Sequence, residues 1–294
     1  MRRTLLSSSF VAVALSLAAC SAASNGSSTG SSANSAGGST SAAAATCTPA
    51  SLSTHTAGTL TVATDSPAYE PWFSNNKPAN GKGFESAVAF AVAKQLGYTP
   101  EQVKWVTASF NSVIAPTPKK YDFDINEVSI TPARAKAVDF STGYYDVAQS
   151  VITLKGSKIA NAKSIADLHG AKLGAQQGTT SLDAITGVIK PGTTPAEYPT
   201  NDLAVQALKN GQIDGLVVDL PTGLYITAAE LDNSIIVGQL PVTGTPEQFG
   251  LVLTKASPLT SCVSKAVDAL RADGTLTALQ QQWLTTSAGA PELS

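Results

Sequence analysis

Segments with the pattern of a strand alternate along this chain with segments that have the pattern of a helix, and the series starts again near the middle. The first series opens with a strand at 59–64 and a helix at 84–96, and the second opens with a strand at 151–154. Such alternation favours α/β layers over a β-sandwich or a helical bundle. At 294 residues the chain is long enough for two units of about a hundred residues each. We therefore predict an α/β fold built from two units.

The composition excludes several classes of function. The chain is 43% hydrophobic and 14% charged, and its formal net charge of -2 includes two N-terminal arginines but no basic run. A nucleic-acid partner is therefore not expected. The two histidines, His55 and His169, are far apart, and neither has a plausible nucleophile or a cysteine cluster beside it. We predict neither a metal site nor a Ser-His-Asp hydrolase.

The N-terminus has the features of an export signal. Residues 1–19 combine a basic start, an apolar stretch over 10–19 and a small-residue ending, and they are too short to remain as a membrane span. The ending Leu17-Ala18-Ala19-Cys20 resembles a bacterial lipobox, which implies cleavage before Cys20 and a lipid on that residue. An ordinary secretory cleavage site beside a chance cysteine is the alternative. A lipid would hold the protein at the outer face of the cell membrane.

The segment after Cys20 contains mainly Ser, Ala, Gly, Asn and Thr up to about residue 45, without a charge. It cannot form a core, so we assign 20–57 to a lipidated N-terminus and flexible linker. Two further cysteines, Cys47 and Cys262, remain. In an exported protein they are expected to form a disulfide, and two buried thiols are the alternative.

One segment concentrates polar groups in a way that suggests anion binding. Ser129 and Thr131 alternate at strand spacing, Pro132 can begin a helix, and Arg134 then falls on its first turn. Apart from the N-terminal pair, the chain has only this arginine and Arg271, whereas it has fifteen lysines. A guanidinium binds a carboxylate through two parallel hydrogen bonds. The alternative is a surface ion pair between Arg134 and Asp139.

Other polar residues follow strands or begin helices, where open α/β sheets bind ligands. Asp65 follows the first strand, Thr180 lies at a helix start, and Asp219 follows the apolar strand 216–218. Hydroxyls, an arginine and isolated carboxylates together suit a zwitterion.

As a set, these motifs resemble the polar-amino-acid family of extracellular solute-binding proteins that serve ABC importers. The similarity extends from Gly58 to Leu284, and it is carried by 65–73, Gly83-Phe84-Glu85, 129–134, 138–141, Gly178-Thr179-Thr180, 207–211, 217–219 and 272–275. The resemblance implies a two-lobe periplasmic binding protein of type II, with the ligand cleft between the lobes and hinge crossovers near 146–150 and 242–248. Lobe 1 would comprise 58–147 and 245–288, and lobe 2 would comprise 150–242.

The resemblance also implies a function and its partners. The protein would be the extracytoplasmic, lipid-anchored subunit that captures an amino acid by lobe closure and delivers it to an ABC permease. We expect a monomer without a cofactor and without enzymatic activity. Two alternatives stay open at this point. One is a dehydratase-like enzyme on the same scaffold with Glu127 as general acid, and the other is a subunit that presents ligand to a sensor.

Family resemblance assigns roles to the matching residues. Arg134 would clamp the ligand α-carboxylate with Ser129 and Thr131 beside it, helped from the second lobe by Thr180 and by backbone N–H groups of Thr179 and Thr180. Asp219 would bind the α-ammonium. Tyr69 and Phe110 would sandwich the ligand side chain, with Trp72 at the rim. The simpler alternatives are core packing for the three aromatics and backbone hydrogen bonding for Asp65 and Thr131.

The sequence departs from the family pattern at two positions that touch specificity. Glu127 stands where relatives often carry Gly beside the ligand ammonium, and Ser66 lengthens the loop between Asp65 and Tyr69. If Glu127 and Asp65 face the ligand, a cationic side chain is favoured. If Glu127 turns outward, Gln176 would instead contact an amide or acid on the ligand.

Overall fold

The structure is a computed structural model that describes residues 46–242, 244–284 and 290–294. The predicted signal peptide, the proposed lipidation site Cys20 and most of the predicted linker lie outside these residues. Within the described ranges, none of the helices combines the length and apolar character of a membrane span.

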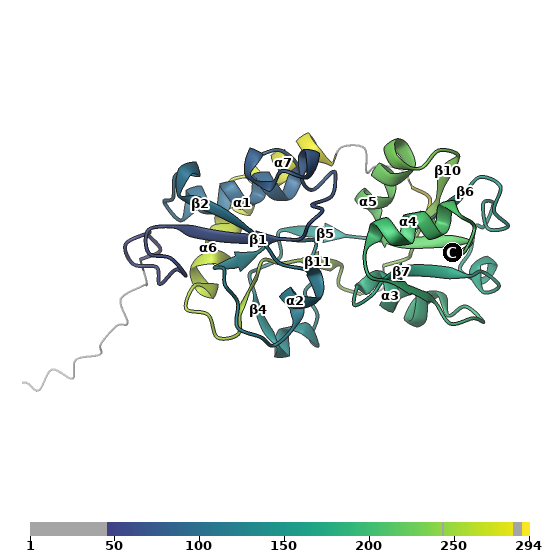
Figure 1. The fold of residues 1–294 in the computed structure, drawn as a ribbon, viewed down its shortest axis with the longest axis horizontal. Helices are drawn as coiled ribbons and strands as arrows, with labels where there is room; N and C mark the ends of the chain where they lie inside the picture. The colour runs from purple at the N-terminus through teal and green to yellow at the C-terminus, as the bar shows by residue number, and fades with distance from the viewer. Residues whose placement is uncertain (1–45, 243, 285–289) are drawn as a thin grey trace, which may run out of the picture. The chain divides into compact units, whose positions relative to one another are not determined.

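The first sheet has the strand order β2-β1-β3-β12-β4. Its strands β1, β2 and β4 are labelled in Figure 1. The strand β1 runs parallel to β2 and β3, whereas β12 is antiparallel to β3 and β4. The strands are β1 (Leu60–Thr64), β2 (Val103–Thr107), β3 (Phe123–Asp124), β4 (Val138–Phe140) and β12 (Val252–Thr254).

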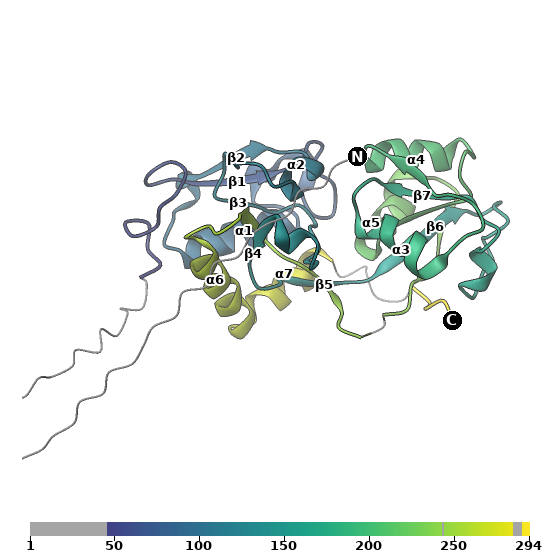
Figure 2. The same cartoon turned by 90° about the horizontal axis from the view of Figure 1, so that it is seen from below.

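Three helices pack together beside this sheet: α1 (Phe84–Gln95), α6 (Thr260–Ala272) and α7 (Thr275–Trp283) (Figures 1 and 2). The helix α1 starts at Gly83, where φ is 93° and a Cβ atom would lie 2.4 Å from the Trp72 carbonyl oxygen, so only glycine fits. Its Val88, Ala89 and Val92 are fully buried. A short helix, α2 (Phe110–Ile114), completes the group that we call the first lobe.

The second sheet has the order β10-β6-β9-β7-β8. Its strands are β6 (Gln149–Leu154), β7 (Leu173–Gln176), β8 (Ala196–Tyr198), β9 (Gly215–Asp219) and β10 (Ser234–Gln239). The accompanying helices are α3 (Thr180–Ala184), α4 (Asn201–Lys209) and α5 (Leu220–Tyr225), and we call this group the second lobe. Two π-helical segments, Ile185–Ile189 and Ile226–Glu230, continue α3 and α5. The predicted two-unit α/β architecture is confirmed.

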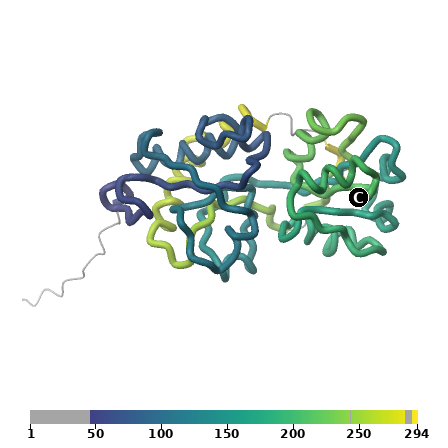
Figure 3. Tube along the Cα trace, viewed as in Figure 1, coloured from purple at the N-terminus to yellow at the C-terminus, as the bar shows by residue number. Residues whose placement is uncertain are grey.

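Two antiparallel strands, β5 (Tyr145–Val147) and β11 (Glu247–Phe249), carry the chain from one sheet to the other and back (Figure 3). Gln248 Nε2 donates to Asp146 Oδ1 at 2.7 Å across this pair. Because both passages lie side by side, a bend here moves the two sheets as units.

The end of the chain returns to the second lobe. Glu292 pairs with Gln239 at the free edge of β10, and Leu293 is 1% exposed in the core of that lobe. Ile165 N–H also donates to the Ser294 carbonyl at 2.9 Å. Residues 290–294 therefore act as an additional edge strand, which the sequence did not suggest.

In the first lobe, Cys47 and Cys262 form a disulfide bond with a Cα–Cα distance of 5.4 Å. The bond joins the segment before β1 to α6 across 215 residues. Closing so long a loop restricts the unfolded chain, which stabilises the folded lobe by roughly 5 kcal/mol in the chain-entropy treatment.

Candidate functional site

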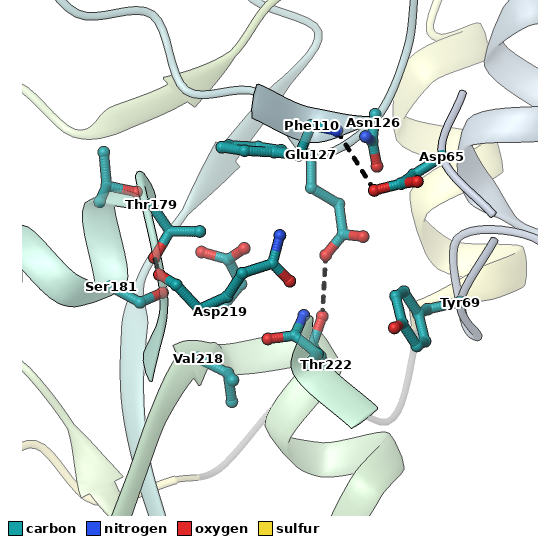
Figure 4. A pocket seen from close by; sticks show the side chains of 13 residues that line it. Asp65, Tyr69, Phe110, Asn126, Glu127, Thr179, Ser181, Val218, Asp219 and Thr222 are labelled. Atoms are coloured by element: carbon teal, nitrogen blue, oxygen red, sulfur yellow. Dashed lines mark hydrogen bonds between the residues drawn. The ribbon is translucent and has the colours of Figure 1, made fainter. Parts of the chain in front are cut away.

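A pocket lies where side chains of both lobes meet (Figure 4). Its lining holds three carboxylates and no basic residue, together with hydroxyls, amides and two aromatic rings. The lining residues are Asp65, Tyr69, Phe110, Asn126, Glu127, Gln176, Thr179, Thr180, Ser181, Asn201, Val218, Asp219 and Thr222. The structure thus brings together Asp65, Tyr69, Phe110, Glu127, Gln176, Thr179, Thr180 and Asp219 from the predicted set.

Asp65 lies just after β1 and holds the start of α2. Its Oδ2 accepts from Phe110 N–H at 3.2 Å, and its Oδ1 accepts from Ser66 N–H at 2.7 Å. The carboxylate therefore satisfies backbone donors while it lines the pocket. Nearby, the Tyr69 hydroxyl is buried without a hydrogen-bond partner among the described residues. Burial raises the pKa of Tyr69, so its hydroxyl keeps its proton and remains available as a donor.

Glu127 lines the pocket, and its backbone has an unusual conformation for a residue with a side chain. Its φ is 53°, in the left-handed region that glycine adopts without strain. Its N–H donates to Glu85 Oε1 at 2.7 Å, which holds the turn, and its side chain extends toward Thr222 (Figure 4). Burial raises the pKa of Glu127 well above its usual range, and the neighbouring Glu85 and Asp219 carboxylates add to the effect.

Asp219 reaches the same pocket from the end of β9. Gln149 Nε2 donates to its Oδ1 at 2.7 Å, while Gln149 Oε1 accepts from Ser181 Oγ at 2.7 Å. Burial raises the pKa of Asp219 well above its usual range, and the nearby Glu247 contributes to the shift. A cation in this pocket would restore the charged form of both Asp219 and Glu127.

The second lobe presents hydroxyls at the start of α3. Thr179 is the N-cap, since its Oγ1 accepts from Leu182 N–H at 3.2 Å. Its hydroxyl hydrogen goes to the Gln176 carbonyl at 2.7 Å. Thr180 Oγ1 lies 3.2 Å from Ser129 Oγ on the first lobe. The backbone N–H groups of this first turn remain as donors.

Arg134 lies beside the pocket and does not line it. It begins a single 3-10 turn (Arg134–Lys136) where the sequence suggested a helix, and it is 9% exposed. Nη1 donates to the Ser129 carbonyl at 2.8 Å, and Nη2 donates to the Gly178 carbonyl of the second lobe at 2.9 Å. The guanidinium carbon also lies 5.3 Å from the centroid of the Phe110 ring. The alternative pairing with Asp139 is wrong, because Asp139 pairs with Lys255 at 3.0 Å.

Ser129 and Thr131 also lie outside the pocket lining. Thr131 Oγ1 accepts from Arg134 N–H at 3.1 Å, so it holds the turn. Ser129 Oγ donates to Glu247 Oε1 in a very short hydrogen bond, and Gln149 Nε2 donates to Glu247 Oε2 at 3.2 Å. The Glu247 carboxylate of β11 therefore accepts hydrogen bonds from a hydroxyl of the first lobe and an amide of the second.

Trp72 belongs to the core, and its predicted place at the rim of the site is not observed. It is 0% exposed, and its ring packs edge-on against Phe84, Tyr145 and Phe249 at centroid distances of 6.0, 5.7 and 5.6 Å. So large an apolar ring is best accommodated in the interior. Only its indole N–H is directed at the other lobe, toward Thr222.

The sequence argument missed several polar residues at the pocket. They are Asn126, Ser181, Asn201 and Thr222 in the lining, and Gln149 and Glu247 beside it. Asn126 directly precedes Glu127 and follows the end of a strand, so its place in the sequence could have suggested that it lines the pocket. Its Nδ2 is buried without a partner among the described residues. Those residues contain no cluster of three or more His, Cys, Asp or Glu side chains suited to a metal ion.

The two sheets are joined by paired crossovers, and both lobes contribute side chains to the pocket. This arrangement defines a two-lobed binding protein of the type II periplasmic class. A family model for bacterial extracellular solute-binding proteins, family 3, matches residues 60–286. The chain therefore belongs to the family 3 bacterial extracellular solute-binding proteins, whose members act outside the cytoplasm.

Individual relatives agree with this assignment. The chain is 31% identical to the "ABC transporter arginine-binding protein 1" of Escherichia coli over 223 residues, which is 74% of this chain and 86% of that protein. It is 29% identical to the "L-cystine-binding protein TcyJ" of Escherichia coli over 231 residues, which is 77% of this chain and 82% of the relative. A solved structure of "an ancestral arginine-binding protein bound to glutamine" matches with a TM-score of 0.65 and 31% identity, covering 78% of this chain and 99% of that one.

All three of these relatives are named as amino-acid-binding proteins rather than as enzymes, and the first is named as part of an ABC transporter. The protein is accordingly an amino-acid-binding component of the ABC transporter class, and the prediction that it is not an enzyme is confirmed.

Proposed function

We propose that this protein captures an amino acid with a cationic side chain and delivers it to an ABC permease. The carrying observation is the charge of the pocket: Asp65, Glu127 and Asp219 line it, and no basic residue does. A cationic amino acid brings two positive groups and one negative group. Of the three relatives described above, two carry arginine in their printed names and the third is named for cystine.

Each charge of such a ligand has a matching group. Asp219 would bind the α-ammonium, because only its Oδ1 is held by Gln149. Arg134 would bind the α-carboxylate through N–H groups other than the two hydrogen bonds to Ser129 and Gly178, since a guanidinium has five N–H donors. The hydroxyls of Ser129 and Thr180 and the N–H groups of Thr179 and Thr180 would complete that end of the site. Asp65 and Glu127 would face the ligand side chain between Tyr69 and Phe110.

The proposed mechanism follows from the distribution of these groups over the two lobes. The arginine, Asp65 and Glu127 come from the first lobe, and Asp219 and the threonines come from the second. A ligand that satisfies both sets favours the closed arrangement, with β5 and β11 as hinges. We assign 58–147 with 245–288 to one moving lobe, and 150–242 to the other.

Calorimetric titration tests this proposal. The full chain, purified in detergent and stripped of bound ligand by unfolding and refolding, would be titrated with the twenty amino acids, ornithine and citrulline. We expect saturable binding with arginine, lysine or ornithine tightest. No binding to any amino acid would refute the function, whereas preference for a neutral ligand would refute only the cationic specificity.

We also propose that the protein is a monomer tethered by a lipid on Cys20, on the sequence evidence for an export signal. Mass spectrometry of the mature N-terminus would detect a diacylglyceryl group. The variant Cys20→Ala should release the protein from membranes, and continued membrane retention would contradict the anchor.

A further inference from the structure

The hydroxyl of Thr222 lies between two side chains of the opposite lobe. Thr222 is on α5 of the second lobe and is 3% exposed. Trp72 Nε1 donates to its Oγ1 at 2.8 Å, and Oγ1 donates to Glu127 Oε2 at 3.0 Å. Both partners belong to the first lobe, so this three-residue chain exists only when the lobes are together. Figure 4 shows the bond from Thr222 to Glu127 at the centre of the pocket.

Hydrogen-bond chemistry fixes the direction of the bond from Trp72. An indole N–H is a donor only, so Thr222 must accept from Trp72. Its hydroxyl hydrogen is directed at Glu127 Oε2, which accepts it when the carboxylate is ionised, as it would be with a cation in the pocket. The other oxygen, Oε1, has no hydrogen-bond partner among the described residues. Glu127 is thereby held as an acceptor with one oxygen left for the pocket.

Glu127 needs such a donor more than most carboxylates do. It sits on a left-handed backbone next to Asp219 and Asp65, with Glu85 behind it. A buried carboxylate stays ionised only when donors or a cation compensate for its lost hydration. Thr222 is the side-chain donor to Glu127 in the structure, and the remaining compensation must come from the ligand.

We propose that Thr222 is a positioning residue that determines specificity. Trp72 holds the Thr222 hydroxyl, and as the lobes close this hydroxyl orients Glu127 toward a second positive charge on the ligand. This inference rests on the proposed function and deepens it. The first lobe carries the selecting carboxylate, and the second lobe orients it only in the closed arrangement. A ligand with a neutral side chain would close the lobes but leave Glu127 uncompensated.

The test compares ligands that differ mainly in side-chain charge. The full chain in detergent and its variants would be titrated with lysine against norleucine and with arginine against citrulline. Thr222→Val keeps the shape and removes the hydroxyl. We expect it to lower the ratio of cationic to neutral affinity by about tenfold to a hundredfold, the range for a hydrogen bond to a charged group. Thr222→Ser should keep the ratio within about threefold, because it retains the donor.

Two controls separate positioning from simple packing. Thr227→Val on the following π-helical segment removes a hydroxyl that donates to Gly223 and Leu224 carbonyls, and it should leave the ratio unchanged. In a Glu127→Gln background, Thr222→Val should have no further effect on the ratio, because the two act as a unit. Trp72→Phe should lower the ratio in the same direction by a smaller factor, and it decides the matter if Thr222→Val does not fold.

Equal loss of affinity for both members of each ligand pair in Thr222→Val would overturn the positioning role. A wild-type protein that binds neutral amino acids without preferring the cationic partner would also overturn it, while the transport function would stand. A wild-type protein that binds none of the four ligands would instead count against the proposed function itself.

Discussion

The two lobes solve the problem of buried polarity differently. The first lobe buries ionisable groups, namely Glu85, Asp122, Asp124 and Arg134, and its largest core cluster contains aromatic rings such as Trp72, Phe84 and Phe249. The second lobe, among its described residues, has one carboxylate buried at the pocket, Asp219, and its other buried polar side chains are neutral, such as Ser150, Ser181 and Thr222. The first lobe therefore supplies two of the three carboxylates that line the pocket, Asp65 and Glu127, together with the neighbouring Arg134. The second lobe supplies mainly neutral donors that complete the site on closure.

The largest expected effect follows removal of the buried arginine. Arg134→Ala should abolish amino-acid binding, with a loss of at least about 3 kcal/mol, since it would leave the buried ligand carboxylate without its charged partner. Calorimetry would measure this loss. Lys136→Ala, two residues away and exposed, is the matched control and should bind normally. Near-native affinity in Arg134→Ala would refute the proposal that Arg134 binds the ligand α-carboxylate. It would also refute the proposal that the first lobe binds the ligand through this charge.

The next largest effect concerns pH and the acid beneath the pocket. Burial raises the pKa of Glu85 to about 7 from its ordinary 4.5. The folded state therefore holds this proton more tightly than the unfolded state, so its contribution to stability is complete below pH 4.5 and is lost as the pH rises through 7. The shift corresponds to about 3 kcal/mol.

Glu85→Gln should flatten this part of the stability profile, because an amide oxygen can still accept from Glu127 N–H and Tyr144 Oη. Denaturant unfolding at several pH values between 4.5 and 8 would measure the difference. Glu101→Gln, at an exposed acid, should reproduce the wild-type profile. If the unfolding free energy of Glu85→Gln varied with pH in the same way as that of the wild type, Glu85 would not be the buried acid described here.

A smaller effect is expected at the C-terminal edge strand of the second lobe. Leu293→Ala should lower the free energy of unfolding by about 2–3 kcal/mol, because the side chain fills an aliphatic cluster. Hydrogen exchange should show the loss in β10 and β6 and leave β1 protected. The exposed neighbour Glu292→Ala serves as the control. Equal deprotection of both lobes would show that they do not unfold as separate units.

The smallest effect is expected at the start of α4. Thr200 Oγ1 accepts from Leu203 N–H at 3.3 Å, so Thr200→Ala should cost about 1 kcal/mol in stability. The helix positions Asn201 in the pocket lining, yet the ratio of cationic to neutral affinity should not change. A changed ratio would assign side-chain selection to the second lobe as well.

The fold was predictable because the strands and helices follow local patterns. The alternation of the two kinds of segment, the glycine before α1 and the apolar strand ending at Asp219 are all visible in the sequence. The return of residues 290–294 to the second lobe was not, because Leu293 lies in a short segment without periodicity and is buried only by distant strands.

The site was predictable where a residue follows a strand or begins a helix, as Asp65, Thr180 and Asp219 do. Trp72 was misplaced because sequence cannot tell which aromatic faces a pocket and which fills a core. Thr222, Gln149 and Glu247 were missed because their importance arises from partners on the opposite lobe or the crossover strand. Glu127 was noticed only as a departure from the expected family pattern, and its left-handed backbone conformation could not be predicted from the sequence.

The most direct test is a distance between the lobes measured with spin labels. The exposed residues Lys104 and Lys209, one on each lobe, would be replaced as Lys104→Cys and Lys209→Cys, since Cys47 and Cys262 are bonded to each other. We predict that lysine increases the population with the shorter distance, while cadaverine, which lacks the carboxylate, and 6-aminohexanoate, which lacks the α-ammonium, do not. The same shift with either analogue, or none with any amino acid, would contradict the claim that opposite charges of one ligand hold the two lobes together.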